Sequence, residues 1–132
     1  MVSNYLKNIF IVGFLLVGFF VLSLSYSQPD KCGIAVVKSY NQQVMGKNVG
    51  FYVVFKNNSK RSMDAIDYEV NYKNGFNESM GKRSFTWQAG NFFGPKLPGE
   101  SLSDGSTTWV EGANKINVVI KRVHFTDGST CK

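Results

Sequence analysis

The feature that most constrains this chain is the strict alternation of apolar and polar residues across positions 64–74, DAIDYEVNYKN. The apolar positions are Ile66, Tyr68, Val70 and Tyr72, and the polar positions between them are Asp67, Glu69, Asn71 and Lys73. A β-strand points successive side chains to opposite faces, so this pattern gives one buried face and one solvated face. A helix would spread the same charges around its circumference. The stretch therefore predicts a half-buried strand of an antiparallel sheet.

Further short segments predict strands at 33–40, 48–57, 83–89, 106–112, 114–125 and 129–132. In the long segment 114–125 the apolar parity changes between Ile120 and Val123, which predicts a β-bulge near Lys121 and Arg122. The dipeptide that follows, at 127–128, is Asp-Gly, which favours a tight primed turn. About seven strands with regular turn signals predict an all-β fold, an antiparallel immunoglobulin-like β-sandwich.

The first 27 residues differ from the rest of the chain. Lys7 is their only charged residue, an apolar run extends from Ile9 to about Leu24, and Ser25 and Ser27 are small residues suited to signal peptidase. We therefore expect 1–27 to be an apolar signal helix that is cleaved, leaving residues 28–132 as one domain. The alternative is an uncleaved anchor, although the run is shorter than the ~20 residues that a bilayer core requires. Both readings export the chain, to the periplasm, the cell surface or the medium.

Two cysteines lie at opposite ends of the expected domain, Cys32 near its start and Cys131 next to its last residue. An even number of cysteines in an exported domain predicts a disulfide. The alternative is a pair of free thiols. A domain of about 100 residues buries a limited share of its surface, so a covalent link between its ends would add useful stability.

The segment FKNNSKRSMDAIDYEVNYKNGFNESMG, followed by LPGES, resembles the small bacterial Ig-like sandwich domains of the FxLYD type. The likeness extends from Phe55 to about Ser101 and consists of a strand, an Asn-rich turn, an alternating strand, a Gly turn and a later Pro-Gly-Glu. The Phe-x-Leu-Tyr-Asp signature itself is absent. The resemblance implies an exported or surface sandwich with no established catalytic residues.

His124 is the only histidine, and its neighbours Val123 and Phe125 are apolar. By strand parity we expect His124 to face solvent beside Arg122. A zinc site needs three or four convergent ligands, which one histidine and a disulfide-bonded cysteine cannot supply. No nucleophile motif is present, and the acidic residues have the distribution of surface charge. We expect no enzyme, no catalytic residue, no metal and no cofactor.

The basic residues include three doublets, which are Lys60-Arg61, Lys82-Arg83 and Lys121-Arg122. The chain has a net charge of +6, of which the expected signal segment contributes only Lys7. If the doublets shared one face, they would attract a polyanion such as an acidic polysaccharide. Dispersed surface charge is the alternative. We expect no nucleic acid as a partner, and contact with a membrane only if the segment 1–27 is retained.

The stretch FTWQAGNFFGPKLPG contains the best candidate for a binding site. Phe92 and Phe93 are adjacent within a Gly- and Pro-rich loop, and Lys96 follows closely. Exposed aromatic side chains on a loop are preferred contacts for proteins and sugars. The alternative is that one of the two rings plugs the end of the sandwich. We expect a non-catalytic module that binds an unidentified protein or glycan, with a polyanion-binding or purely structural envelope protein as the alternative.

Overall fold

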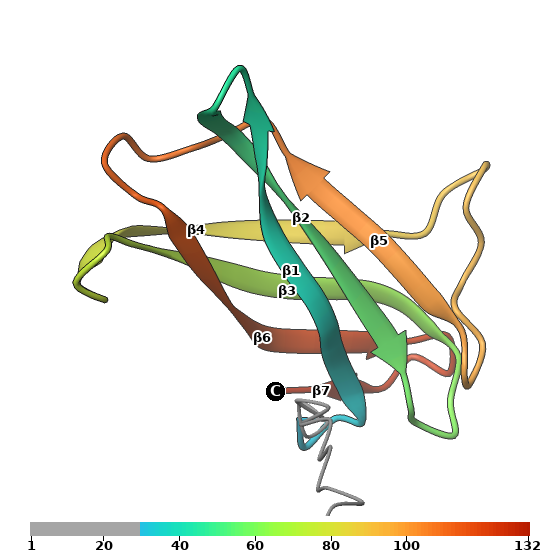
Figure 1. Cartoon of the computed structure of the whole chain (residues 1–132). Coiled ribbons are helices and arrows are strands. Elements are labelled where there is room, and N and C mark those ends of the chain that lie inside the picture. Colours follow the sequence, from blue (N-terminus) through green and yellow to red (C-terminus); the bar gives the residue numbers. More distant parts are fainter. Residues whose placement is uncertain (1–29) are drawn as a thin grey trace, which may run out of the picture.

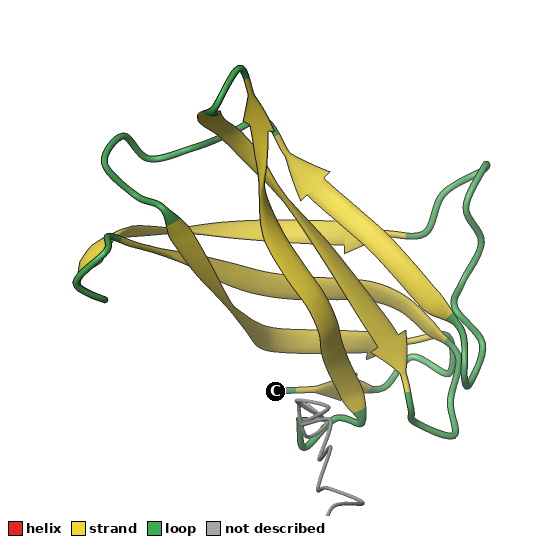
Figure 2. Cartoon of the chain, viewed as in Figure 1, coloured by secondary structure: helices red, strands yellow, loops and turns green. Residues whose placement is uncertain are grey.

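The structure, a computed structural model, describes residues 30–132, and the predicted signal segment 1–27 lies outside these residues. The described chain forms strands and loops without a helix (Figures 1 and 2). The strands are β1 (Ile34–Val44), β2 (Lys47–Asn57), β3 (Met63–Lys73), β4 (Ser79–Gln88), β5 (Ser101–Ser106), β6 (Lys115–Phe125) and β7 (Thr130–Cys131). Across residues 30–132, no helix is long and apolar enough to span a membrane.

The strands form two antiparallel sheets that face each other. One sheet has the order β1-β2-β5, and the other has the order β4-β3-β6-β7. The chain changes sheet after β2, after β4 and after β5, whereas β1-β2, β3-β4 and β6-β7 are hairpins within one sheet. The predicted all-β antiparallel sandwich is therefore confirmed.

The core lies between the sheets and consists of side chains of alternate parity. On β3 the four apolar residues of the alternating segment, Ile66, Tyr68, Val70 and Tyr72, are all buried. They face Phe51, Val53 and Phe55 of β2. Burial of each such side chain stabilises the fold by roughly 1.5–3 kcal/mol relative to exposure. The strand predicted from the alternation is confirmed, and it is central in its sheet.

The predicted bulge in the last long strand is also confirmed. Arg122 pairs with Asp67 and Ile120 pairs with Tyr68, so Lys121 is the extra residue. The shift brings Val123 and Phe125 into the core, where both are fully buried. The turn at 127–128 is present, but Gly128 is its only residue with a positive φ (85°). It is therefore a type I turn followed by a left-handed glycine, and not the primed turn that we predicted.

The strand predicted at 106–112 is wrong. The fifth strand is β5, which lies earlier and has the polar sequence SLSDGS. An apolar pattern is weak there because Leu102 is the one buried side chain of this edge strand. Trp109 lies in the following loop, packs edge-to-face on Tyr72 at 5.2 Å and donates its indole N–H to the carbonyl of Ala113 (3.1 Å). The sequence around Trp109 suggested a strand because it contains apolar residues, but these residues cover the end of the core from a loop.

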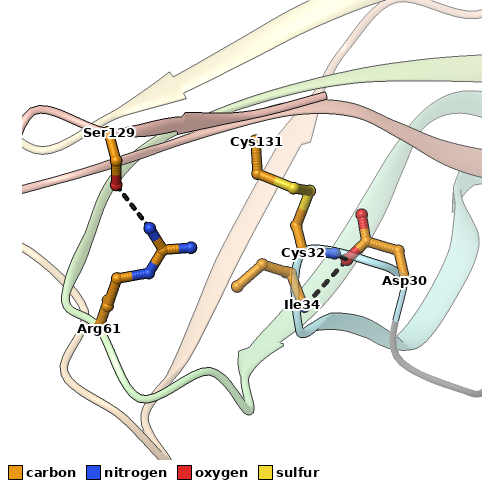
Figure 3. Close-up of a disulfide and its surroundings, with 6 residues drawn as sticks. All are labelled: Asp30, Cys32, Ile34, Arg61, Ser129 and Cys131. Atoms are coloured by element: carbon orange, nitrogen blue, oxygen red, sulfur yellow. Dashed lines mark hydrogen bonds between the residues drawn. A yellow bond between two sulfur atoms is a disulfide. The ribbon is translucent and has the colours of Figure 1, made fainter.

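A disulfide joins Cys32 and Cys131, as predicted, with their Cα atoms 5.7 Å apart (Figure 3). Cys32 immediately precedes β1 and Cys131 ends β7, so the bond connects one edge of each sheet. The Asp30 carboxylate accepts hydrogen bonds from the backbone N–H groups of Cys32 (3.0 Å) and Ile34 (3.1 Å). These bonds fix the chain where it enters the sandwich.

Replacing both cysteines by alanine is expected to lower the free energy of unfolding by about 2–4 kcal/mol, because the bond closes a long loop in the unfolded chain. The two positions are 99 residues apart. Urea denaturation of the two proteins measures the difference. Alkylation of the folded wild type without reductant is expected to modify no thiol, and two modified cysteines would contradict the account.

Candidate binding site

A groove of about 780 Å³ lies between the edges of β4 and β5. Its lining residues are Thr86, Trp87, Gln88, Phe93, Lys96, Ser101, Leu102, Ser103 and Asp104. Side chains alternate between faces along a strand, so three consecutive residues of β4 and four of β5 line the groove partly through their backbone edges. The groove therefore combines two exposed strand edges with apolar side chains.

The apolar part of the groove is formed by Trp87 and Phe93 together with Leu102. Trp87 is half-buried and packs against the core, as does its neighbour on the same face, Phe85. Leu102 is buried. Phe93 comes from the loop between β4 and β5, which extends away from both sheets (Figure 2). The groove can thus accept apolar groups between a fixed tryptophan and a loop phenylalanine.

Asp104 lines the groove, and hydrogen bonds within the domain hold its carboxylate in place. Its Oδ2 accepts a hydrogen bond from the hydroxyl of Tyr68 (2.7 Å), and its Oδ1 accepts one from the backbone N–H of Gly105 (2.9 Å). Burial, and then the contact with Asp104, raise the pKa of Tyr68 far above its ordinary value, so the phenol keeps its proton. Both carboxylate oxygens therefore have donors within the domain, and the carboxylate ties the core of one sheet to the edge of the other.

The structure brings Phe93 and Lys96 together at the groove and places Phe92 beside them at the tip of the loop. Phe92 is 95% exposed and Phe93 is 70% exposed, so neither ring plugs the end of the sandwich. The backbone N–H of Gly90 donates to the carbonyl of Phe93 (2.9 Å), which closes the tip. Lys96 forms a bridge with Met63 of β3 through two backbone hydrogen bonds of 2.7 and 2.9 Å.

The base of the loop is held by Asn57, whose side chain is fully buried. Its Nδ2 donates to the carbonyls of Arg61 (2.8 Å) and Lys96 (2.9 Å). Its Oδ1 accepts from the backbone N–H (3.0 Å) and the hydroxyl (2.6 Å) of Ser59. One amide thus links the β2–β3 turn to the β4–β5 loop and positions the segment that contains the aromatic tip.

The Pro-Gly-Glu segment at 98–100 forms a turn that completes this base. Gly99 follows Pro98 and has a φ of 87°, as the third position of a type II turn requires. The backbone N–H of Glu100 donates to the carbonyl of Leu97 (3.0 Å), and the Glu100 carboxylate accepts from the N–H of Leu97 (2.9 Å). The loop is therefore rigid at its base, and its exposed rings lie at its tip.

His124 points outward, as predicted, but it has a partner that the sequence did not reveal. Its Nδ1 lies 2.6 Å from Oδ1 of Asp64, and 44% of the His124 side chain remains exposed. A pocket of about 250 Å³ over Ala65 is lined by His124 and Asp67 among others. The hydrogen bond from Thr86, and then Arg122, hold the pKa of Asp67 below its ordinary range despite partial burial. This polar surface ties three strands together by side-chain bonds.

The basic doublets lie on three separate segments, and one member of each contacts a carboxylate. Arg122 pairs with Asp67 (2.5 Å), and Lys82 pairs with Glu69 (3.6 Å). Arg61 lies 3.9 Å from Asp127, donates to the hydroxyl of Ser129 (2.6 Å, Figure 3) and covers the ring of Phe125. Within residues 30–132, the other member of each doublet is in no ion pair: Lys60, Arg83 and Lys121.

Within the described range 30–132, no three histidine, cysteine, aspartate or glutamate side chains gather in a way that could hold a metal ion. Sequence reasoning identified Phe93 and Lys96 as binding residues but not the strand residues that line the groove, among them Trp87 and Asp104. Their meeting depends on how the fourth and fifth strands face each other across the sandwich, which local alternation does not encode. The inward parity of Trp87 on a strand next to the Phe92–Phe93 loop is the one signal that could have indicated it.

No family model and no curated protein matches the chain. Among solved structures, its fold is similar to that of a hypothetical protein from Peptoclostridium difficile 630, determined by X-ray crystallography at 1.85 Å resolution. The TM-score is 0.57, the sequence identity is 10%, and the match covers 76% of this chain and 86% of that chain. At this identity the likeness shows the fold alone.

Replacing Asn57 by alanine is expected to lower the free energy of unfolding by at least about 2 kcal/mol, because buried carbonyls and the Ser59 groups lose their partners. It is also expected to accelerate amide exchange across 96–100. Asn58→Ala is the matched control, since Asn58 is the exposed neighbour. Urea denaturation and hydrogen exchange make the comparison. Equal stability of the two variants would contradict the role of Asn57 in holding the loop.

Proposed function

We propose that this domain is an exported, non-catalytic binding module that recognises a protein or a glycan through the β4–β5 groove and the Phe92–Phe93 loop. The observation that carries the proposal is the placement of Phe93, which lines the groove beside Trp87 and Lys96 yet keeps most of its surface exposed. Two adjacent exposed phenylalanine rings leave apolar surface in water. A partner that covers them would recover this free energy.

The rigidity of the loop base supports this role. Asn57 and the Leu97–Glu100 turn fix the ends of the aromatic segment, so a partner would pay little entropy to order it. Lys96 is in no ion pair within residues 30–132, which leaves its ammonium free to orient a polar group of the partner. Aromatic anchors with a nearby polar contact are the usual composition of such sites.

The proposal includes export and an immunoglobulin-like type of sandwich. The apolar segment 1–27 and the Cys32–Cys131 disulfide support an oxidising compartment outside the cytoplasm. If β1 to β7 are given the immunoglobulin letters A, B, C, C′, E, F and G, one sheet has the order ABE and the other has the order C′CFG. The constant-type immunoglobulin domain has the same strand order, except that its fourth strand pairs with the fifth strand and here it pairs with the third. This strand order supports the immunoglobulin-like class.

The alternative is a polyanion-binding or purely structural envelope protein. It rests on Lys60, Arg83 and Lys121, the cations of the doublets that have no ion pair in the described part of the chain. Because they come from a turn, an edge strand and a bulge, they do not form a contiguous basic surface along one element. The aromatic groove is therefore the better-supported site.

Replacing both Phe92 and Phe93 by alanine is expected to weaken partner binding by about tenfold or more, because aromatic anchors contribute about 2 kcal/mol or more at such interfaces. Binding is measured by partner recovery from cell-envelope extract and on a glycan array. Phe76→Ala is the matched control, because Phe76 is 87% exposed but lies in the turn at the other end of β4.

Ionic strength separates the two candidate functions. Contact through the aromatic loop is expected to persist as salt rises, whereas binding through the basic doublets would collapse. Equal recovery by the double variant and by the wild type would refute the role of the loop. Loss of binding above physiological salt, with the loop variant unaffected, would favour the polyanion alternative.

A further inference from the structure

The two strand edges that border the groove differ in the hydrogen-bonding groups they offer. The N–H of Asn57 at the end of β2 donates to the carbonyl of Glu100, which fixes which β5 residues bond to β2. The backbone N–H and C=O groups of Ser101, Ser103 and Gly105 therefore point away from β2, toward the groove side. Asp104 already accepts the N–H of Gly105, and the strand is short. The β5 edge is therefore partly satisfied by its own side chain.

The β4 edge is longer and open. The N–H of Ala89 donates to the carbonyl of Asp64, and every second residue of β4 bonds to β3 in an antiparallel ladder. The β4 residues whose backbone groups bond to β3 are therefore 83, 85 and 87. The N–H and C=O groups of Lys82, Ser84, Thr86 and Gln88 then point away from the sheet. In residues 30–132, no strand lies on that side of β4. Natural sheets usually cover or block such an edge.

We propose, building on the binding role above, that the partner is an extended polypeptide segment that pairs with the free edge of β4 as an additional strand. Backbone bonds to residues 82, 84, 86 and 88 hold the segment, and every second side chain of the segment enters the groove beside Trp87 and Phe93. Strand addition of this kind combines main-chain affinity with side-chain specificity in alternate pockets.

Charge complementarity identifies the segment as acidic. The strand β4 contains Lys82 and Arg83 and no carboxylate. The groove is lined by one cation, Lys96, and one carboxylate, Asp104, whose two oxygens already accept hydrogen bonds. Glu69 contacts Lys82, whereas Arg83 and Lys96 are in no ion pair in the described range. Antiparallel pairing of β4 with a second copy would bring these cations no carboxylate, because β4 contains none. An acidic peptide is therefore favoured over self-association.

The test uses the full mature domain and an array of synthetic ten-residue peptides in which apolar and polar positions alternate. Half of the peptides have aspartate or glutamate at the polar positions and at the groove-facing position next to Arg83, whose side chain shares the face of Trp87, and half have serine at the same positions. The acidic peptides are expected to bind about two- to fivefold more tightly for each charge pair. In the bound wild type, amide exchange at Ser84, Thr86 and Gln88 is expected to slow, because their N–H groups acquire acceptors. Unchanged exchange at these amides in the complex would overturn the proposal.

Proline variants test the same bonds by substitution. Ser84→Pro and Gln88→Pro each remove an N–H that points away from β3, a position where an edge strand tolerates proline. Each is expected to weaken peptide binding by about tenfold or more. The control Ser84→Ala keeps the N–H and changes a side chain outside the groove lining, so its binding is expected to stay within about twofold of wild type. The urea midpoint and the absence of free thiols confirm folding. Equal binding by folded proline and alanine variants would overturn the proposal.

The outcomes distinguish this inference from the binding role on which it rests. Binding of a glycan, or of a peptide, that requires Phe92 and Phe93 but is indifferent to proline at 84 and 88 keeps the binding role and refutes strand addition. Protection of the β4 amides that depends on protein concentration without peptide would identify a second copy as the occupant and refute the acidic segment. Binding of no peptide on the array also refutes it.

Discussion

The side-chain amide of Asn57 is the interaction on which the architecture of the groove depends. It lies fully buried at the end of β2 and bonds to the carbonyls of Arg61 and Lys96 and to both donors of Ser59. A buried amide must satisfy its donors and acceptor or cost stability, so this position selects one arrangement of two loops. The loop that begins at Ala89 and ends at Glu100 therefore returns to β5 along a single path, and its aromatic tip lies next to the groove.

The two sides of the sandwich are closed in different ways. On one side, the Cys32–Cys131 disulfide links the entry to β1 with β7 (Figure 3). On the other side, β4 and β5 are edge strands of opposite sheets, because β4 pairs with β3 and not with β5. That choice of partner leaves the edge of β5 and the edge of β4 without neighbouring strands, and the groove forms between them. A covalent bond thus closes one side of the sandwich, and the groove lies on the opposite side.

Sequence patterns predicted those parts of the fold that alternation and turn chemistry determine locally. The strand over 64–74, the bulge near Lys121 and the disulfide follow from parity and cysteine placement, and all three are present. The fifth strand was misplaced because Trp109 covers the core from a loop, while β5 itself is a polar edge strand held by β2. The groove could not be predicted, because it arises where the edges of two strands from opposite sheets meet, and local alternation does not encode which strands become edges.

Site-specific photo-cross-linking in the living cell tests the central claim, that the partner binds at the β4–β5 groove, most directly. The photoreactive residue p-benzoylphenylalanine replaces Phe93 in one variant and Phe76 in another; both rings are exposed, but they lie at opposite ends of β4. The account predicts a discrete polypeptide adduct from position 93 and none from position 76. Adducts of equal yield from both positions, or from position 76 alone, would contradict it.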